Sequence, residues 1–198
     1  MLRVGLTGGI ATGKSYCLAR FAALGAAVVD ADRLARDAVA PGSRALEAVS
    51  LRFGPAILLP DGSLDRAALG RIVFSDRAAR ADLEAIVHPE VYRGIGEWFA
   101  SCPPATRLAI ADIPLLFETG HSHDFDRVVV AACDPHQQLT RLMARDRLSE
   151  TEARARLNAQ WPIEEKVARA DHVIRTGGTL ADTDAQVRTV YELLIADC

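Results

Sequence analysis

One short motif, placed directly after an apolar run, constrains the fold of this chain more than any other feature. The segment Gly8-Gly9-Ile10-Ala11-Thr12-Gly13-Lys14-Ser15 matches the pattern G-x-x-x-x-G-K-[ST] at every fixed position. The run Leu2–Thr7 before it is typical of a short buried strand, and residues 14–24 after it have helical character, ended by Gly25. A further short strand follows over Ala26–Val29. Strand, glycine-rich turn, helix and strand together predict a βαβ unit and a parallel sheet.

The residue types in this motif suit the binding of phosphate groups. Glycines allow backbone N–H groups to point inward around phosphate oxygens, and the start of the following helix adds partial positive charge. Lys14 is long enough to reach the β- and γ-phosphates of a nucleotide, and the Ser15 hydroxyl is a suitable Mg²⁺ ligand. The alternative is a glycine-rich turn that binds nothing. We predict an ATP and Mg²⁺ site whose nucleotide-binding residues are Gly8, Gly9, Ile10, Ala11, Thr12, Gly13, Lys14, Ser15 and Tyr16.

Three more short aliphatic runs predict further strands of the same sheet, over 108–113, 127–132 and 172–175. A long stretch of mainly helical spacing separates the second strand from the third, with candidate helices over 66–74, 78–86 and 89–100. Because this stretch is longer than an ordinary crossover, we expect a helical subdomain inserted into the sheet domain. Ser149 with Glu152, and Thr179 with Asp182, predict capping pairs that open two later helices, the second over 180–196.

Carboxylates end two of the predicted strands, and ligands of open α/β sheets bind beyond such strand ends. The second strand leads into Asp30 and Asp32, and the third ends near Asp112. Asp32 is suited to accept or orient the proton of an attacking hydroxyl, and Asp112 to hold Mg²⁺ directly or through water. Capping of the next helix is the alternative role of Asp30 and Asp32. With a phosphate-binding loop beside them, we expect at least one of the two to be functional.

A second excursion from the sheet, over 145–166, is rich in arginine. Arg141 and Arg145 lie four residues apart on a helix that begins near Pro135, so they share a face of it. A mobile arginine-bearing segment can close over a nucleotide, exclude water and neutralise charge on a transferred phosphoryl group. The alternative is a solvated helix face with glutamates as surface partners. We expect a role in transfer for at least one of Arg141 and Arg145.

Composition excludes several other classes of protein. The net charge of −3 gives no support to a general nucleic-acid binder, although a local basic patch is compatible with that total. Four scattered cysteines, with no C-x-x-C pair, argue against a zinc site or a disulfide framework. The start of the chain is too short and glycine-broken for a signal peptide, and no apolar run approaches the roughly 18 residues that span a bilayer. We therefore expect a protein of the reducing cytoplasm, with no membrane partner.

Taken together, these segments resemble the dephospho-coenzyme A kinase family over almost the whole chain. The most diagnostic run is Asp112-Ile113-Pro114-Leu115-Leu116-Phe117-Glu118, because generic phosphate-loop kinases lack it. Tyr16 and the segment Arg175–Thr179 depart from the family pattern. The other segments that carry the resemblance are Leu6–Ser15, Val29–Asp32, Asp61–Arg66, Val87–Pro89 with its His-Pro turn, Arg141–Asp146 and Ala153–Arg156.

The resemblance implies a three-layer P-loop kinase fold of the α/β class. It would have a mostly parallel sheet (core about 1–30, 105–144 and 167–198), an inserted helical substrate-binding subdomain (about 31–104) and a lid (about 145–166). The implied reaction is transfer of the γ-phosphoryl group of ATP to the ribose 3′-hydroxyl of dephospho-coenzyme A, the last step of coenzyme A synthesis.

The resemblance also implies a role for each candidate residue. Catalysis would fall to Asp32, Lys14, Arg141 and Arg145, and the metal to Ser15 and Asp112. The acceptor would be held by Asp32, His88, Pro114, Leu115 and Glu118.

Three other functions compete with this interpretation. Another small-molecule kinase of the same fold, such as a nucleoside monophosphate kinase, is disfavoured by the run Asp112–Glu118. A GTPase-like switch is disfavoured because the chain has no N-K-x-D guanine motif. A nucleotide-dependent binding protein without turnover differs from a kinase in ADP release with and without an acceptor. The sequence gives no indication of the oligomeric state.

Overall fold

The computed structural model describes residues 1–198 and contains one sheet of five parallel strands in the order β2-β3-β1-β4-β5. The prediction of a parallel α/β fold is confirmed, and each predicted strand is present within one residue of its expected ends. The strands are β1 (Leu2–Gly8), β2 (Ala27–Asp30), β3 (Leu108–Asp112), β4 (Arg127–Ala132) and β5 (His172–Arg175).

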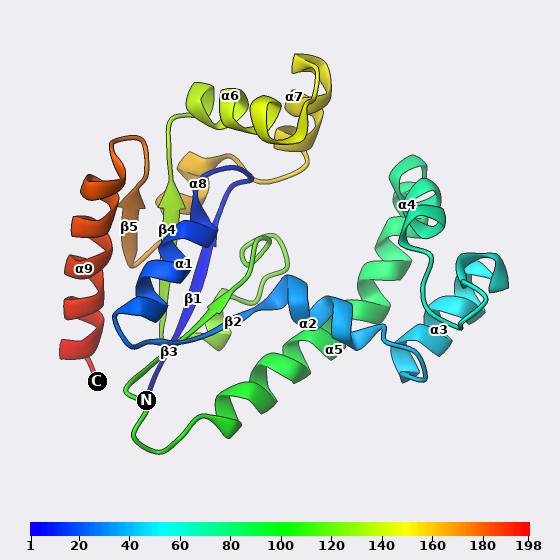
Figure 1. Cartoon of the computed structure of the whole chain (residues 1–198), viewed down its shortest axis with the longest axis horizontal. Helices are drawn as coiled ribbons and strands as arrows, with labels where there is room; N and C mark the ends of the chain where they lie inside the picture. Colours follow the sequence, from blue (N-terminus) through cyan, green and yellow to red (C-terminus); the bar gives the residue numbers. More distant parts are fainter. The chain divides into compact units, whose positions relative to one another are not determined.

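Nine α-helices and two short 3-10 turns connect these strands (Figure 1). The capping boxes predicted at Ser149 with Glu152 and at Thr179 with Asp182 are both confirmed. The helices are α1 (Lys14–Ala23), α2 (Ala31–Ala38), α3 (Arg44–Phe53), α4 (Arg66–Ser75), α5 (Arg77–Ser101), α6 (Pro135–Asp146), α7 (Glu150–Asn158), α8 (Ile163–Val167) and α9 (Leu180–Ala196), with 3-10 turns η1 (Pro55–Ile57) and η2 (Ser122–Asp124).

Strand β1 lies at the centre of the sheet, with β3 on one side and β4 on the other. Leu6 is in register with Asp112 of β3 and with Val129 of β4, so the carboxyl ends of the three strands meet at one edge. Both faces of these strands are buried, which explains why each reads as a continuous apolar run rather than as an alternating one.

Helices cover both faces of the sheet. Helices α1 and α9 contact each other and share a buried cluster with alternate strand residues. Apart from Cys17 and Phe21, the buried residues of that cluster are aliphatic, in keeping with the 6% aromatic content. On the other face, α8 contacts β4, while Leu116 and Phe125 lie over Gly5 of β1. Helices α6 and α7 lie beyond the carboxyl ends of the strands (Figure 1).

The chain divides into two compact units, one made of Met1–Asp30 with Ser101–Cys198 and the other of Ala31–Ala100. The first unit contains the whole sheet. The second is helical and has its own core, to which Leu46, Val49 and Ile57 contribute.

Helix α5 corrects one prediction. The sequence predicts two helices separated by a turn at His88-Pro89, whereas Arg77–Ser101 is one helix of 25 residues with Pro89 inside it. Proline lacks the N–H group that would bond to the carbonyl four residues earlier, so the helix loses one hydrogen bond there. Buried residues on both sides of the proline, among them Ala79, Val91 and Ile95, keep the chain helical through this gap. None of the helices has the length and apolar character that crossing a bilayer requires.

Candidate active site

The glycine-rich loop lies between the end of β1 and the start of α1, as predicted. Gly8 is closely packed, because a Cβ at this position would lie 2.5 Å from the carbonyl oxygen of Ala131 on the neighbouring strand. Gly13, the residue before α1, has φ 82°, which favours glycine. Ala11 has φ 61° despite its Cβ, a conformation that costs about 1–2 kcal/mol. The surrounding structure therefore holds this loop in one particular shape.

Side chains from within the loop and from other elements bind the carbonyl groups of the loop. The buried Thr12 hydroxyl donates to the Gly9 carbonyl at 2.8 Å, and Gln138 Nε2 donates to the Ile10 carbonyl at 2.7 Å. Thr176, just after β5, donates its hydroxyl to the Thr12 carbonyl at 2.6 Å. In a trans peptide the N–H group of the next residue points opposite to the carbonyl. The amides of Ala11 and Gly13 are therefore directed away from these supporting side chains, as a phosphate-binding loop requires.

The Lys14 ammonium forms an ion pair with Oδ1 of Asp112. The side chain of Asp112 is 4% exposed and that of Lys14 is 13% exposed, so the pair is largely shielded from water. Asp112 is also in register with Asp30, the last residue of β2. The structure thus brings together, at the carboxyl edge of the sheet, the lysine of the loop and two of the strand-end carboxylates that the sequence singles out.

The residues predicted to hold Mg²⁺ fit that ion chemically. Ser15, in the first turn of α1, is exposed and offers a hydroxyl oxygen, and Asp112 offers a carboxylate. The chain has no group of three or more His, Cys, Asp or Glu side chains that would form a metal cage. Mg²⁺ does not need one, since it usually takes one or two protein oxygens together with water and substrate phosphates.

Arg141 and Arg145 both lie on α6 but have different partners. Arg141 donates to the carbonyl of Thr176 at 2.8 Å, and Thr176 in turn binds the phosphate loop at the Thr12 carbonyl. Arg145 forms a two-bond ion pair with Asp146, whose second oxygen also binds Arg156 at 2.9 Å. The bonds from Arg145 hold the pKa of the Asp146 carboxyl below its usual range. Although the two arginines lie four residues apart on the same helix, they therefore bind different partners.

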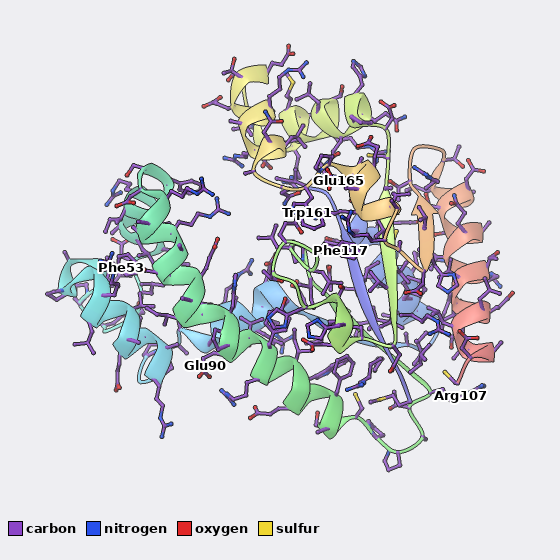
Figure 2. The ribbon with its side chains drawn as sticks, turned by 180° about the vertical axis from the view of Figure 1, so that it is seen from behind. Phe53, Glu90, Arg107, Phe117, Trp161 and Glu165 are labelled. Atoms are coloured by element: carbon purple, nitrogen blue, oxygen red, sulfur yellow. The ribbon has the colours of Figure 1, made fainter.

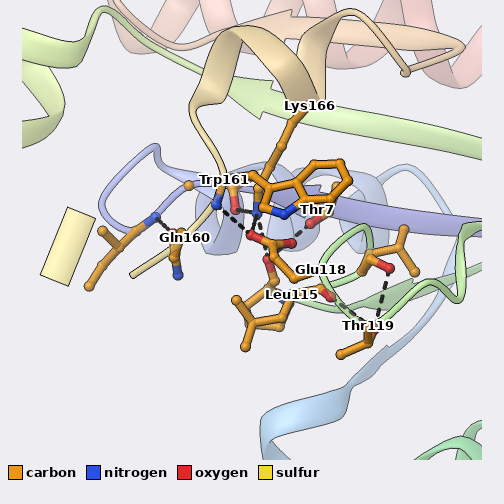
Figure 3. Close-up of polar contacts among 12 residues, drawn as sticks. Thr7, Leu115, Glu118, Thr119, Gln160, Trp161 and Lys166 are labelled. Carbon is orange, nitrogen blue, oxygen red and sulfur yellow. Dashed lines mark hydrogen bonds and ion pairs between the residues drawn. The ribbon is translucent and has the colours of Figure 1, made fainter. Parts of the chain in front are cut away.

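The segment after β3 forms a compact loop with its own polar network (Figure 3). The Pro114 carbonyl accepts from the Thr7 hydroxyl at 3.2 Å, and the Leu115 carbonyl accepts from the Thr119 hydroxyl at 2.9 Å. Glu118 Oε1 accepts from the backbone N–H of Trp161 at 3.0 Å and pairs with Lys166 at 2.7 Å. The run Asp112–Glu118 is thus bound to β1 through Thr7 and to α8 and the segment before it through Glu118.

An aromatic contact joins this loop to the segment before α8. The rings of Phe117 and Trp161 are stacked, 6.3 Å apart and inclined by 7° (Figure 2). The guanidinium of Arg169 lies 4.8 Å from the centre of the Trp161 ring. Trp161 is therefore fixed through both its ring and its backbone.

Three other predicted residues have positions that bear on their roles. Tyr16 follows the loop, but its hydroxyl donates to Asp184 of α9 at 2.8 Å, and this bond raises the pKa of Tyr16. Its side chain therefore links α1 to α9. Asp32 and His88 belong to the helical unit, where Asp32 is exposed in the first turn of α2 and His88 is inside α5.

Sequence reasoning missed four residues that support the site: Gln138, Gln160, Thr176 and Lys166. Gln160 Oε1 accepts from the N–H of Ile10 at 2.8 Å, across 150 residues of sequence. Lys166 is completely buried and reaches the Gly8 carbonyl. The one available signal was composition, because Lys14 and Lys166 are the only lysines in the chain.

The fold and the site together define a P-loop kinase, in which a parallel sheet presents a phosphate loop at its carboxyl edge. The fold is shared with shikimate kinase from Acinetobacter baumannii, with a TM-score of 0.53, 15% identity and coverage of 100% of this chain and 94% of that one.

A narrower assignment comes from closer relatives. The family model for dephospho-CoA kinase matches residues 2–182. Dephospho-CoA kinase from Geobacillus kaustophilus is 46% identical over 96% of both chains, and that from Anaeromyxobacter dehalogenans is 51% identical over 88% of this chain and 83% of the relative. The crystal structure of a Thermus thermophilus protein has a TM-score of 0.83 at 37% identity, covering 98% of this chain and 97% of that one. Dephospho-CoA kinase from Campylobacter jejuni has a TM-score of 0.76 at 30% identity, covering 98% of each chain. The chain belongs to the dephospho-CoA kinase family.

Proposed function

We propose that this chain transfers the γ-phosphoryl group of ATP to the ribose 3′-hydroxyl of dephospho-CoA, giving CoA and ADP. The observation that carries the proposal is the complete phosphate loop, with Lys14 paired to Asp112 at the carboxyl edge of the sheet, in a member of this family. The reaction needs little covalent chemistry from the protein, so positioning and neutralisation of charge dominate catalysis.

In this proposal the loop amides and Lys14 hold the phosphates of ATP. The amides of Ala11 and Gly13, directed away from their supporting side chains, donate to phosphate oxygens together with the N-terminus of α1. The ammonium of Lys14 moves from Asp112 toward the β- and γ-phosphates. Mg²⁺, when bound at Ser15 and Asp112, neutralises phosphate charge and helps to align the nucleotide. Tyr16 contributes through its backbone, since its hydroxyl is committed to Asp184.

The acceptor hydroxyl is assigned to Asp32. A carboxylate there orients the 3′-hydroxyl and accepts its proton as the bond to phosphorus forms. The other acceptor contacts are assigned to His88 and to the Pro114–Glu118 segment, which is anchored to Thr7 and Lys166. Arg141 and Arg145 neutralise charge on the transferred group, Arg145 after exchanging Asp146 for phosphate oxygens.

The same assignment also predicts the compartment, the roles of the subdomains and the partners of the enzyme. We propose a cytoplasmic enzyme in which 31–104 is the substrate subdomain and 145–166 is a lid over the nucleotide. The substrates are small molecules, and the acidic net charge favours neither nucleic acid nor membrane as a partner.

The test is ADP release measured with a panel of acceptors: dephospho-CoA, AMP, pantothenate and shikimate. We expect ADP only with dephospho-CoA and a product phosphorylated at the ribose 3′ position. Preference for AMP would indicate a nucleoside monophosphate kinase instead. ATP binding without acceptor-dependent ADP release would indicate a binding protein without turnover.

A further inference from the structure

Lys166 is a buried cation that the proposed reaction does not use. It lies on the short helix α8, its side chain has no exposed surface, and its Nζ contacts three oxygens (Figure 3). These are Oε1 of Glu118 at 2.7 Å, the Pro114 carbonyl at 3.0 Å and the Gly8 carbonyl at 3.4 Å. An ammonium has three N–H donors, so the hydrogen-bonding capacity of Lys166 is filled.

The charge of Lys166 is balanced within the protein. Burial lowers the pKa of Lys166, and the Glu118 carboxylate opposes that shift. Glu118 in turn depends on this lysine, because its Oε2 atom is buried and has no hydrogen-bond partner. The remaining bond to Glu118 comes from the N–H of Trp161, on the segment that leads into α8. The pair therefore joins α8 to the loop that follows β3.

Two of the three contacts lie at strand ends that carry the proposed chemistry. Gly8 is the last residue of β1 and the first of the phosphate loop. Because its carbonyl is directed toward Lys166, the N–H of Gly9 in the same trans peptide points the opposite way. Pro114 is two residues beyond Asp112, the partner of Lys14. One ammonium thus restrains both the entry to the loop and the chain that follows Asp112.

We propose that Lys166, held by Glu118, is a positioning residue that sets the orientation of the first phosphate-loop peptide and the place of Asp112 for nucleotide binding. This inference rests on the proposed function of the loop. Lys166 acts through Gly8 and Pro114 and does not itself touch the reacting atoms.

The test compares Lys166→Met, which keeps the unbranched chain but removes the ammonium, with the double variant Lys166→Met/Glu118→Gln. The single variant leaves the Glu118 carboxylate buried without its cation, so we expect a lower thermal midpoint. It also leaves the carbonyls of Gly8 and Pro114 without the ammonium, so we expect ADP binding to weaken about tenfold or more. The double variant removes both charges. We expect its thermal midpoint to recover most of the loss while its ADP affinity stays low, because the carbonyls of Gly8 and Pro114 still have no cation.

Val187→Ala is the matched control for loss of stability. Val187 is completely buried on α9 in the main core, and the residues that form this core include none from the phosphate loop or α8. We expect it to lower the thermal midpoint and to leave ADP affinity within twofold of the unsubstituted protein.

The result that overturns the proposal is a double variant that binds ADP within twofold of the unsubstituted protein, since Lys166 would then serve stability alone. If the single variant fails to fold, the double variant decides the matter by itself. ADP affinity is measured by calorimetry without acceptor. An unsubstituted protein that binds ADP but does not phosphorylate dephospho-CoA would therefore overturn the proposed function and leave this test intact.

Discussion

At the scale of single residues, replacing Lys14 changes two things at once, because its ammonium faces both the phosphate site and Asp112. We expect Lys14→Met to reduce phosphoryl transfer at least about 10²-fold, the usual cost of removing a group that stabilises transition-state charge. We also expect a lower free energy of unfolding, by about 3 kcal/mol, because the Asp112 carboxylate is left buried without its cation. The measurements are single-turnover transfer and denaturant unfolding.

Adding Asp112→Asn to Lys14→Met separates these two effects. The second substitution removes the Asp112 charge, so stability returns. Because Asp112 is also assigned to Mg²⁺, the effect on the phosphates is measured as ADP affinity in the presence of a metal chelator, and we expect that affinity to stay low. Recovery of ADP affinity together with stability would show that Lys14 acts through the fold and not on the phosphates.

Asp32→Asn tests catalysis against helix capping, since Asn keeps the shape of Asp and also caps helices well. If Asp32 accepts or orients the acceptor proton, single-turnover transfer at saturating ATP and dephospho-CoA falls about 10²–10⁴-fold. ATP affinity and the thermal midpoint stay near their original values. A rate within about threefold of the original, far below the range of a general base, would transfer the role to Asp30 or leave positioning alone.

At the scale of elements, the proposed lid divides into two parts with different attachments. Helix α7 packs through its buried Ala153 on an apolar cluster with α6, against which Ile10 and Ala11 also pack. Its polar contacts, such as the Ser149 and Glu152 capping box and the Arg156–Asp146 pair, are local. The segment 160–166 is bound to the site through Gln160, Trp161 and Lys166. The moving part of the lid is therefore expected to end before Gln160.

Hydrogen exchange with and without a non-hydrolysable ATP analogue tests this division. We expect the analogue to slow exchange in 147–159, where arginines gain phosphate partners, and to change exchange in 160–166 little. Equal protection of 147–159 in both states would argue against a lid.

Most helices and strands could be predicted from local patterns in the sequence. All five strands were predicted because each is a short aliphatic run, and two capping boxes were predicted because their signals span only four residues. The predicted break at Pro89 was wrong because one missing hydrogen bond does not end a helix that packs on both sides of the proline, through Ile86 and Val87 before it and Val91 after it. Contacts such as Gln160 with Ile10 had no local signal, since they join residues 150 positions apart.

In the candidate site, too, the residues with a local signal could be predicted and those that depend on long-range contacts could not. The loop, Lys14 and Asp112 follow from a motif and from the rule that parallel strands present their carboxyl ends at one edge. The residues that hold the loop from outside come from α6, α8 and the end of β5, and only the folded chain brings them together.

At the scale of the whole molecule, the two compact units give different expectations for stability. The phosphate loop belongs entirely to the unit that contains the sheet. ADP at about 100 times its dissociation constant should therefore stabilise that unit by about 2.7 kcal/mol. We expect the slowest amides of β1, β3 and β4 to gain this protection in hydrogen exchange, and those of α3 and α4 to gain much less. An equal gain in all five elements would show that the two units unfold as one.

The central position of β1 also affects how the chain folds while it is being synthesised on the ribosome. Its partners begin at Leu108 and Arg127, so about 100 residues must be added after Gly8 before either neighbour exists. At typical rates of synthesis this takes about 5–20 s. The helical segment Ala31–Ala100, whose core is formed from its own residues, can fold during that interval. The apolar side chains of Val4 and Leu6, completely buried in the finished enzyme, stay exposed for all of it, which makes this strand the natural target of a chaperone.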